Sequence, residues 1–220
     1  MDTFDRPIVV DRRQTPRGEL VLRRVGAHFE VIANGTFLMD TRDERSERAL
    51  VREAIAGRNG LRVLIGGLGV GFSLAEALAS PACSEVVVCE LEPAVVEWAR
   101  DHLGGCGLDD PRVRLLVCDL RDALEPLAGR LDAICLDVDN GPAWLVHAEN
   151  AAIYGDAGVD RLAACLRPGG RLAVWASAPD AAFEARLRAR FADVRVVRVA
   201  ARRGPDDVIY VAEVSPSTSR

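Results

Sequence analysis

The chain has 220 residues, of which 49% are hydrophobic and 28% are charged, and its net charge at pH 7 is −5. This length suffices for one domain with a full core, and the acidic balance argues against a general nucleic-acid surface. No apolar run approaches the roughly 20 residues of a membrane span. The acidic N-terminus does not resemble a signal peptide, so we expect a cytoplasmic protein without membrane contact.

The first elements in chain order are strands between residues 18 and 39. The stretches ELVLRR and HFEVIA flank a Val-Gly-Ala turn, and Asn34-Gly35 then precedes TFLMD. Asn-Gly between apolar runs is the strongest short signal for a β-hairpin. We therefore expect a small antiparallel β-meander over residues 1–42, which is too small to fold alone and packs on the chain that follows.

After the meander, the pattern changes to helices alternating with strands. The segment DERSERALVREAIAG is predicted to be a helix, with Asp43 as its N-cap and Gly57 as its stop. Apolar strands are then expected at 61–66, 85–90, 112–118, 131–137 and 171–177, and helices at 71–80, 93–103, 120–127, 156–166 and 179–191. Such alternation with near-continuous apolar strands is typical of a parallel sheet covered on both faces.

The C-terminal segments DVRVVRVAA and DVIYVAEV are joined by a tight Gly204-Pro205-Asp206 turn, so they must pair antiparallel. The predicted fold is therefore α/β, with a doubly wound, mostly parallel, seven-stranded Rossmann-like sheet that ends in an antiparallel hairpin. We expect the catalytic domain to span residues 43–214. The polar tail, residues 215–220, is expected to be disordered.

The residue types that are missing narrow the chemistry. All 28 basic residues are arginine, which excludes a lysine Schiff base and the lysine of a standard P-loop. The six cysteines form no Cys-x-x-Cys pair, and the three histidines are scattered. We expect small buried thiols in a reducing compartment and no metal site.

Glycines and acids gather where the parallel strands end. Four glycines follow the strand 61–66 or close it: Gly66, Gly67, Gly69 and Gly71. The next three strands end at Glu90, Asp119 and Asp137. Because ligands of open parallel sheets bind beyond the carboxyl ends of the strands, these residues are predicted to converge on one crevice.

Each of these groups suits one part of a ribonucleoside. The glycines allow the backbone to approach a ligand closely. Glu90 can accept hydrogen bonds from both ribose hydroxyls, and Asp119 can accept one from an adenine amino group. For any single acid, a helix N-cap or a solvated turn is an equally good interpretation, and Asp119 begins a predicted helix. Together with the glycine loop, the acids favour a ribonucleoside site.

The glycine spacing favours S-adenosylmethionine over a nicotinamide dinucleotide. The loop reads G-x-G-x-G at Gly67, Gly69 and Gly71, whereas the dinucleotide fingerprint is G-x-G-x-x-G, and here position 72 is Phe. The terminal antiparallel hairpin favours the same choice. With these features the chain resembles the class I S-adenosylmethionine-dependent transferases.

More narrowly, residues 18–214 resemble the spermidine synthase (polyamine aminopropyltransferase) branch of that superfamily. The resemblance is carried by VLIGGLGVG, CELEPAVVEWAR, DPRVRLLVCDLRDAL and LDAICLDVDNGP…IYGDAGVDRLAACLRPGG. It implies that Glu90 holds the ribose, Asp119 the adenine and Asp137 an amine substrate. The cofactor it implies is S-adenosylmethionine or its decarboxylated form.

The sequence departs from the family pattern at three places. Leu68, Gly69 and Val70 replace the third Gly, the Asp and the next Gly of the family's Gly-Gly-Gly-Asp-Gly-Gly loop, and that Asp helps to hold the aminopropyl end. The family's Asp-Ser-Ser-Asp-Pro region is shortened here to residues 137–142. The segment after Asp43-Glu44 also lacks the Tyr and His that line the family's polyamine site. The cofactor half of the resemblance is thus stronger than the substrate half.

We expect Asp137, helped by Asp139, to attract a cationic amine and to accept its proton. Two interpretations are open for Tyr154 and Trp144 in the loop 138–154: they bind substrate where the loop covers the site, or they only pack that loop. Trp175, inside a strand, is expected in the core.

Three functions remain open from the sequence. The first is an aminopropyltransferase-like enzyme that acts on a small amine. The second is a methyltransferase that uses the same site with intact S-adenosylmethionine, and the third is a nucleoside-binding protein that has lost catalysis. The N-terminal meander offers a sheet edge for a homodimer.

Overall fold

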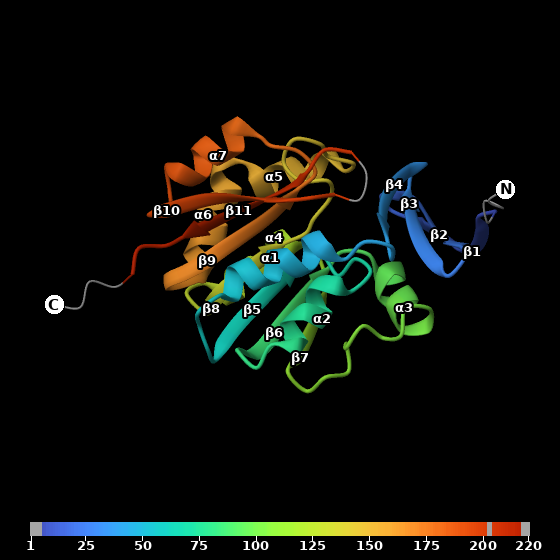
Figure 1. The fold of residues 1–220 in the computed structure, drawn as a ribbon, viewed down its shortest axis with the longest axis horizontal. Helices are drawn as coiled ribbons and strands as arrows, with labels where there is room; N and C mark the ends of the chain where they lie inside the picture. The colour runs from blue at the N-terminus through green and yellow to red at the C-terminus, as the bar shows by residue number, and fades with distance from the viewer. Residues whose placement is uncertain (1–5, 202–203, 217–220) are drawn as a thin grey trace.

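The structure is a computed structural model that describes residues 6–201 and 204–216. It contains a four-stranded sheet near the N-terminus and a seven-stranded sheet in the main body (Figure 1). The predicted α/β class is confirmed, with its doubly wound, mostly parallel sheet and its small antiparallel sheet. Residues 217–220 of the predicted disordered tail lie outside the described residues.

The large sheet has the strand order β10-β11-β9-β8-β5-β6-β7. Its strands are β5 (Leu61–Gly66), β6 (Cys83–Glu90), β7 (Val113–Val117), β8 (Leu131–Leu136), β9 (Leu166–Ala176), β10 (Asp193–Val199) and β11 (Asp207–Glu213). β5 to β9 run parallel to one another, whereas β11 pairs antiparallel with β9 and β10. The winding reverses at β5, between β6 and β8, which opens a crevice at the carboxyl ends of these strands.

Helices cover both faces of this sheet, because alternate residues of a strand point to opposite faces. In β5, Val63 and Ile65 join the core under one group of helices, and Leu64 joins the core under the other. The first group is α1 (Arg45–Ile55), α2 (Phe72–Ala79) and α3 (Pro93–Asp101). The second is α4 (Leu120–Leu124), α5 (Ala151–Tyr154), α6 (Asp156–Cys165) and α7 (Ala181–Arg188), with single turns at Glu125–Leu127 and Ala148–Asn150.

The small sheet is an antiparallel meander of β1 (Ile8–Thr15), β2 (Gly18–Val25), β3 (His28–Ala33) and β4 (Thr36–Asp40). The hairpin predicted at Asn34-Gly35 is present, with both residues at positive φ. β1 is an addition to the sequence prediction. Its side chains are exposed or half-buried, so its sequence IVVDRRQT carries no clear apolar alternation.

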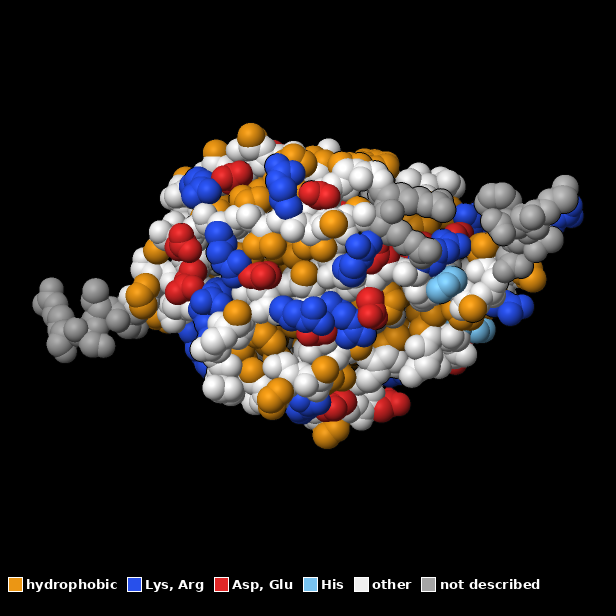
Figure 2. Space-filling model, viewed as in Figure 1, with side chains coloured by type: hydrophobic (Ala, Val, Ile, Leu, Met, Phe, Trp, Pro, Cys, Tyr) orange, Lys and Arg blue, Asp and Glu red, His pale blue; other side chains and the backbone are white. Residues whose placement is uncertain are grey.

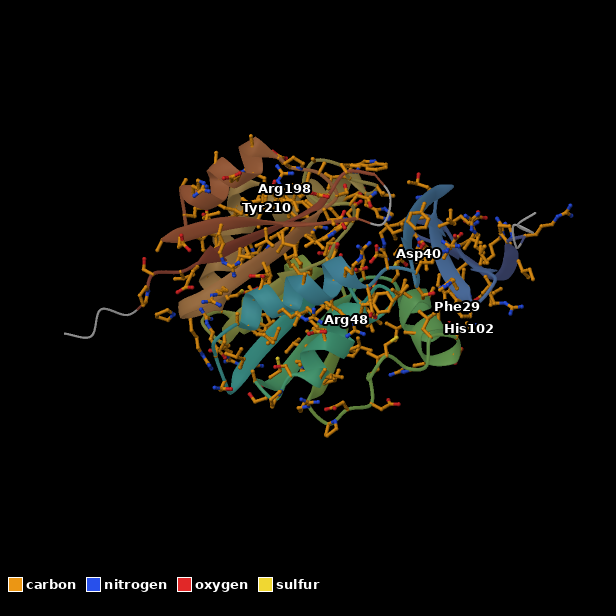
Figure 3. All side chains as sticks on the ribbon, viewed as in Figure 1. Phe29, Asp40, Arg48, His102, Arg198 and Tyr210 are labelled. Carbon is orange, nitrogen blue, oxygen red and sulfur yellow. The ribbon has the colours of Figure 1, made fainter. Side chains whose placement is uncertain are left out.

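The small sheet docks on α3, as Figure 1 shows. Trp98 of α3 is only 2% exposed and packs with Leu22 and Val31 of the sheet, while its indole Nε1 donates to Asp11 at 2.8 Å. The rings of Phe29 and His102 add a contact 6.2 Å between centroids, at the place labelled in Figure 3. An aromatic residue of the large domain thus anchors the meander.

The start of the first helix differs from the prediction. Asp43 is not the N-cap: α1 begins at Arg45, and Glu44 takes the cap position without a side-chain hydrogen bond. The Asp43 carboxylate instead accepts from the backbone and the guanidinium of Arg45. An arginine two residues later competes for the carboxylate that would otherwise cap the helix.

Charges of both signs are interspersed on the face formed by α1 and α2 (Figure 2). Glu76 there pairs with Arg48 and Arg52, and Glu53 pairs with Arg195. Within the described part of the chain, no helix is both long and apolar enough to cross a bilayer. The expected lack of a nucleic-acid surface and the homodimer both stay predictions.

Candidate active site

A cavity of about 840 Å³ opens at the carboxyl ends of β5, β6 and β8. Its walls include Gly67, Gly69 and Gly71 and the acids that follow these strands: Glu90, Asp119, Asp137 and Asp139. The N-terminal sheet supplies another wall, with Phe37 and Met39 among its lining residues. The structure therefore brings together most of the predicted site residues, in a space that two sheets enclose.

The glycines are needed first of all by the protein's own packing. A Cβ on Gly67, whose φ is +92°, would lie 2.2 Å from the backbone oxygen of Asp137. A Cβ on Gly71, with φ +91°, would lie 2.3 Å from the Cβ of Cys106. Gly66 is the end of β5 and does not line the cavity, whereas a Cβ on Gly69 would meet only the Met39 sulfur at 3.4 Å. Gly69 is thus the glycine that leaves space for a ligand.

Glu90 is buried beside the glycine loop, with 7% of its surface exposed. Its Oε2 accepts from the backbone N–H of Leu68 and its Oε1 from that of Glu92, both at 2.8 Å. Burial raises the pKa of this carboxyl group above its ordinary value. Since a carboxylate has about four acceptor positions, two remain for ligand hydroxyls.

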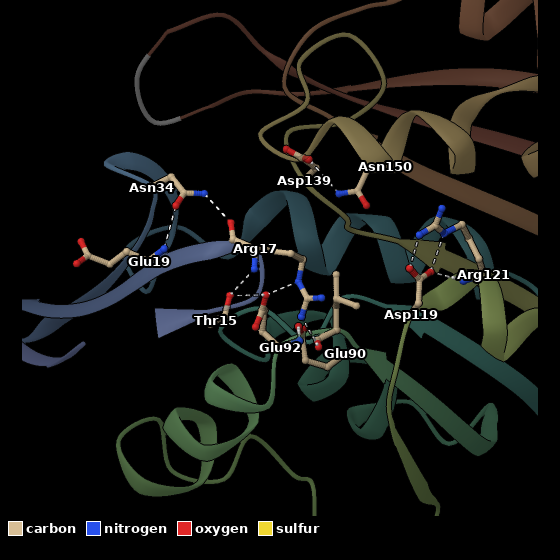
Figure 4. A network of polar contacts seen from close by, with 11 residues as sticks. Thr15, Arg17, Glu19, Asn34, Glu90, Glu92, Asp119, Arg121, Asp139 and Asn150 are labelled. Carbon is tan, nitrogen blue, oxygen red and sulfur yellow. Dashed lines mark hydrogen bonds and ion pairs between the residues drawn. The ribbon is translucent and has the colours of Figure 1, made fainter. Parts of the chain in front are cut away.

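The turn between β1 and β2 reaches the same place. Arg17 Nε donates to Glu92 Oε1 at 2.6 Å, and Arg17 Nη2 donates to the Leu91 carbonyl at 3.3 Å (Figure 4). Thr15 Oγ1 also donates to Glu92, at 3.4 Å. The guanidinium therefore ties the N-terminal sheet to the strand end that carries Glu90.

Asp119 is the N-cap of α4, which is one of the two interpretations that its sequence left open. It accepts from the Arg121 backbone N–H at 2.8 Å and from the Arg121 guanidinium at 3.0 and 2.6 Å. These bonds hold the pKa of Asp119 below its usual value. Asp119 also lines the cavity, so its part in adenine binding stays a prediction.

Asp137 follows β8 directly, and its backbone N–H donates to Gly66 O at 2.9 Å. Burial, with the nearby negative charge of Asp207, raises the pKa of Asp137 to about 6, although the Ser73 hydroxyl opposes that shift by hydrogen bonding. A carboxyl group that titrates near neutral pH is suited to exchange a proton with a ligand.

Asp139 holds the following loop instead of a substrate. Its residue has φ +62°, and its two oxygens accept from the backbone N–H groups of Asn140, Val146 and His147 and from Asn150 Nδ2, at 2.6 to 3.0 Å. With both oxygens engaged, Asp139 is a loop clamp, and the predicted catalytic help from it is not supported by its geometry.

The two aromatic residues predicted to bind substrate do not line the cavity. Tyr154 is buried in the core and donates its hydroxyl to the Val138 carbonyl at 2.6 Å. Trp144 is 58% exposed on the loop surface. Tyr154 packs against the base of the loop and Trp144 lies on its surface. This agrees with the alternative interpretation from the sequence, in which the two residues belong to the loop and do not bind substrate.

Among the cavity residues that sequence reasoning missed are Glu47 of α1, Trp175 of β9 and Asp207 of β11. Trp175 was expected in the core; it packs against the core and also lines the cavity, and its indole Nε1 is buried without a hydrogen-bond partner. Burial and the charge of Asp137 raise the pKa of Glu47 to about 8. Glu90 was found because ligands of parallel sheets bind at the carboxyl ends of the strands. The same rule applies to Trp175, which lies near the carboxyl end of β9.

Among residues 6–201 and 204–216, no group of three or more His, Cys, Asp or Glu side chains is arranged to hold a metal ion.

Known proteins resemble this chain in sequence, although no family model matches it. It is 34% identical over 181 residues to the polyamine aminopropyltransferase of Mycobacterium tuberculosis, a match that covers 78% of this chain and 33% of the relative. It is 35% identical over 150 residues to polyamine aminopropyltransferase 2 of Pseudomonas aeruginosa, covering 62% of this chain and 41% of that protein. The chain thus spans about a third of the length of the former relative and two fifths of the latter.

Solved structures resemble it over more of its length. Spermidine synthase from Thermotoga maritima has a TM-score of 0.80 at 18% identity, over 95% of this chain and 74% of that one. A spermidine synthase in complex with the transition state analogue AdoDATO has a TM-score of 0.82 at 19% identity, with the same coverage. The chain is therefore related in sequence to polyamine aminopropyltransferases and shares the fold of spermidine synthase.

Proposed function

We propose that this chain is a transferase that binds S-adenosylmethionine or its decarboxylated form and transfers an alkyl group, aminopropyl in the first instance, to a small amine. The observation that carries the proposal is the placement of Glu90 and Asp137 in one cavity. Glu90 is bonded to the glycine loop, and Asp137 is bonded to the strand from which that loop emerges. The relatives' names support the same reaction class.

The residues fit a nucleoside cofactor. Glu90 would accept from the ribose hydroxyls with its two remaining acceptor positions, and Asp119 would accept from the adenine amino group. Gly69 leaves room for the chain that carries the sulfur. When bound, the cofactor supplies a sulfonium whose attached carbons are electrophilic.

Asp137 would prepare the acceptor. An alkylamine with a pKa of about 10.4 is mostly ammonium at pH 7, and freeing its lone pair costs roughly 4–5 kcal/mol. A carboxylate at hydrogen-bond distance attracts the cation and then takes one N–H proton. The nitrogen lone pair forms the new N–C bond, and the electron pair of the broken C–S bond remains on sulfur, which becomes a neutral thioether.

Methyl transfer from intact S-adenosylmethionine is a second candidate, and one observation favours it. Gly69 stands where the resembling family has the aspartate that helps to hold the aminopropyl end, and Gly69 faces only the Met39 sulfur. Without a carboxylate at this position to hold the aminopropyl ammonium group, the affinity for the decarboxylated cofactor should exceed that for intact S-adenosylmethionine by less.

Calorimetry with both cofactor forms, followed by turnover assays on an amine panel, tests these proposals. At least tenfold tighter binding of the decarboxylated form, with N-alkylated product, supports aminopropyl transfer. Equal binding with methylated product supports the second candidate. Binding of either form without any turnover would leave a nucleoside-binding protein and overturn both.

Asp137→Asn is the sharpest variant for this test. It should abolish turnover, because the amide cannot accept the ammonium proton, while the cofactor affinity stays within about threefold of the unchanged protein. Full activity in Asp137→Asn would remove this residue from the mechanism.

A further inference from the structure

Among the residues that the structure describes, three acids of the cavity lack both an arginine partner and the backbone N–H donors from other residues that hold the remaining cavity acids. Elsewhere around the cavity, carboxylates are paired with arginine, as Glu92 is with Arg17, or accept from backbone N–H groups, as Glu90 and Asp139 do. Glu47, Asp137 and Asp207 also line the cavity, yet within the described part of the chain none of them forms an ion pair. We call these three residues the carboxylate trio. Its members carry negative charge or retain a proton until a ligand supplies a cation.

The trio is assembled at one edge of the large sheet. Asp137 follows β8 at the edge where the parallel neighbour β9 also ends. Asp207 is the first residue of β11, which pairs antiparallel with β9, so it lies at the same edge. Glu47 sits in the first turn of α1, and α1 packs across β8, β9 and β11. Three elements that are distant in sequence therefore direct acids to one end of the cavity.

Hydroxyl groups serve two of the three acids. Ser46 Oγ donates to Asp207, and the Ser73 hydroxyl bonds to Asp137. Burial and the charges of Asp137 and Asp207 raise the pKa of Glu47 to about 8, so at neutral pH this side chain retains its proton. The pKa of Asp137 is raised to about 6 by the same kind of crowding.

The other charged groups around Glu47 are already engaged. Just before α1, Asp43 also raises the pKa of Glu47, but it is paired with Arg45. On α2, Glu76 is bound by two arginines of α1. On the N-terminal sheet, the acids of the cavity wall pair with Arg42. The trio is thus the part of the wall whose charge a ligand can still change.

We propose that binding of a cationic amine at the trio expels the proton that Glu47 retains, so that Glu47 is a positioning residue that links amine binding to pH. An ammonium group stabilises the ionised carboxylates, and the displaced proton passes to solvent. No covalent bond other than the O–H bond changes. The inference rests on the proposed function only for the identity of the ligand as an amine.

Calorimetric titration with 1,4-diaminobutane tests this inference directly. The titration is run in two buffers that differ in ionisation enthalpy and contain no primary amine, which gives the number of protons released for each amine bound. At pH 7 we expect about 0.8 proton, the value for a group with a pKa near 8 that falls by about two units. At pH 9 the release should approach zero, because Glu47 is already ionised. Butane-1,4-diol, of similar length but uncharged, should release none.

Variants assign the proton to its residue. Glu47→Gln should abolish most of the release at pH 7, and Glu47→Asp should retain it. Glu53→Gln is the matched control, since Glu53 lies on the same helix, is paired with Arg195 and does not line the cavity; it should release protons as the unchanged chain does. Release that persists in Glu47→Gln, or amine binding without release in the unchanged chain, would overturn the inference.

The outcomes also separate this inference from the proposed function. Proton-linked amine binding without turnover would support the trio and contradict the transferase. Turnover without proton release would support the transferase and contradict the trio. Absence of any amine binding by a chain that still binds the nucleoside would overturn the inference.

Discussion

Glu90 combines two tasks in one buried side chain. Its oxygens fix the backbone of the glycine loop through Leu68 and the start of α3 through Glu92, and its remaining acceptor positions are available to a ligand. A substitution here should therefore affect both the loop and the ligand. Burial has already raised the pKa of this group, so hydrogen bonds to its ionised form are especially important.

Glu90→Gln should weaken S-adenosylmethionine binding by about 10- to 100-fold, the range for losing a charge-assisted hydrogen bond. The glutamine side chain also places its NH₂ group where one carboxylate oxygen accepted a backbone N–H, from Leu68 or from Glu92. That backbone N–H group then has no acceptor. Isothermal titration measures the affinity, with Glu97→Gln on the outer side of α3 as control. Unchanged affinity in Glu90→Gln would exclude Glu90 as the ribose ligand.

The sequence predicted where the site acids lie in the fold better than it predicted which groups they contact. Glu90, Asp119 and Asp137 were found because the ends of parallel strands share an edge, which is a property of topology alone. Asp139 could not be interpreted in the same way. It lies two residues beyond its strand, where a positive φ turns its side chain into the loop, and no sequence rule fixes that angle.

At the scale of elements, the segment after β8 is held by Asp139. Four donors from residues 140–150 meet its two oxygens, and Tyr154 fixes the base of the segment through the Val138 carbonyl. Because these bonds lie next to Asp137, the loop sets one side of the cavity.

Asp139→Ala should therefore loosen this loop while leaving the sheet intact. We expect hydrogen exchange of the Val146 and His147 amides to accelerate at least tenfold, since both lose their acceptor, while amides in β5 and β8 keep their protection. Asp122→Ala, on the exposed side of α4, is the control. Unaltered exchange at Val146 and His147 would mean that the clamp contributes nothing to loop order.

Element prediction succeeded where patterns are periodic and failed where contacts decide. The five parallel strands and the terminal hairpin were predicted close to their observed bounds because their apolar runs are continuous. β1 was missed because its two arginines and its one aspartate obscure a strand that is held mainly by pairing with β2. Glu47 and Asp207 were missed for a related reason, since only the packing of α1 and β11 brings them to the cavity.

At the scale of the whole molecule, the trio makes stability depend on pH. The pKa of Glu47 is raised from 4.5 to about 8 and that of Asp137 from 3.8 to about 6. For a group with a raised pKa, the folded state holds the proton more tightly than the unfolded state. Its stabilisation is complete below the unfolded pKa and is lost as pH rises through the folded pKa.

The ligand-free protein should therefore lose stability between about pH 5 and pH 8, from above the ordinary pKa values of these two carboxyl groups up to the folded pKa of Glu47. Acids with lowered pKa values, such as Asp110 at about 2, have finished titrating below this window and do not contribute to the slope. Urea unfolding across the range measures the loss, and Glu47→Gln should flatten it. A slope that is the same in both proteins would assign the loss to another group.

The two sheets are joined through Arg17 and Glu92, and this contact has a testable strength. Arg17→Ala should lower the free energy of unfolding by about 1–3 kcal/mol, because it leaves a buried carboxylate without its cation. Arg12→Ala removes an exposed pair with Glu19 nearby, and should cost less than about 1 kcal/mol. The denaturant midpoints of the two variants are compared. Equal losses of unfolding free energy would mean that the Arg17–Glu92 pair does not stabilise the contact between the sheets.

The contact between Gly67 and the carbonyl of Asp137 has a consequence for how such a chain can change. With Asp137 N–H bonded to Gly66 O, main-chain atoms fix the gap between the glycine loop and Asp137. A side-chain replacement that leaves these main-chain contacts in place leaves the gap unchanged. A different acceptor would therefore have to be accommodated by side-chain changes in the other walls of the cavity, namely α1, the start of β11 and the N-terminal meander. The distance between the glycine loop and Asp137 would stay the same.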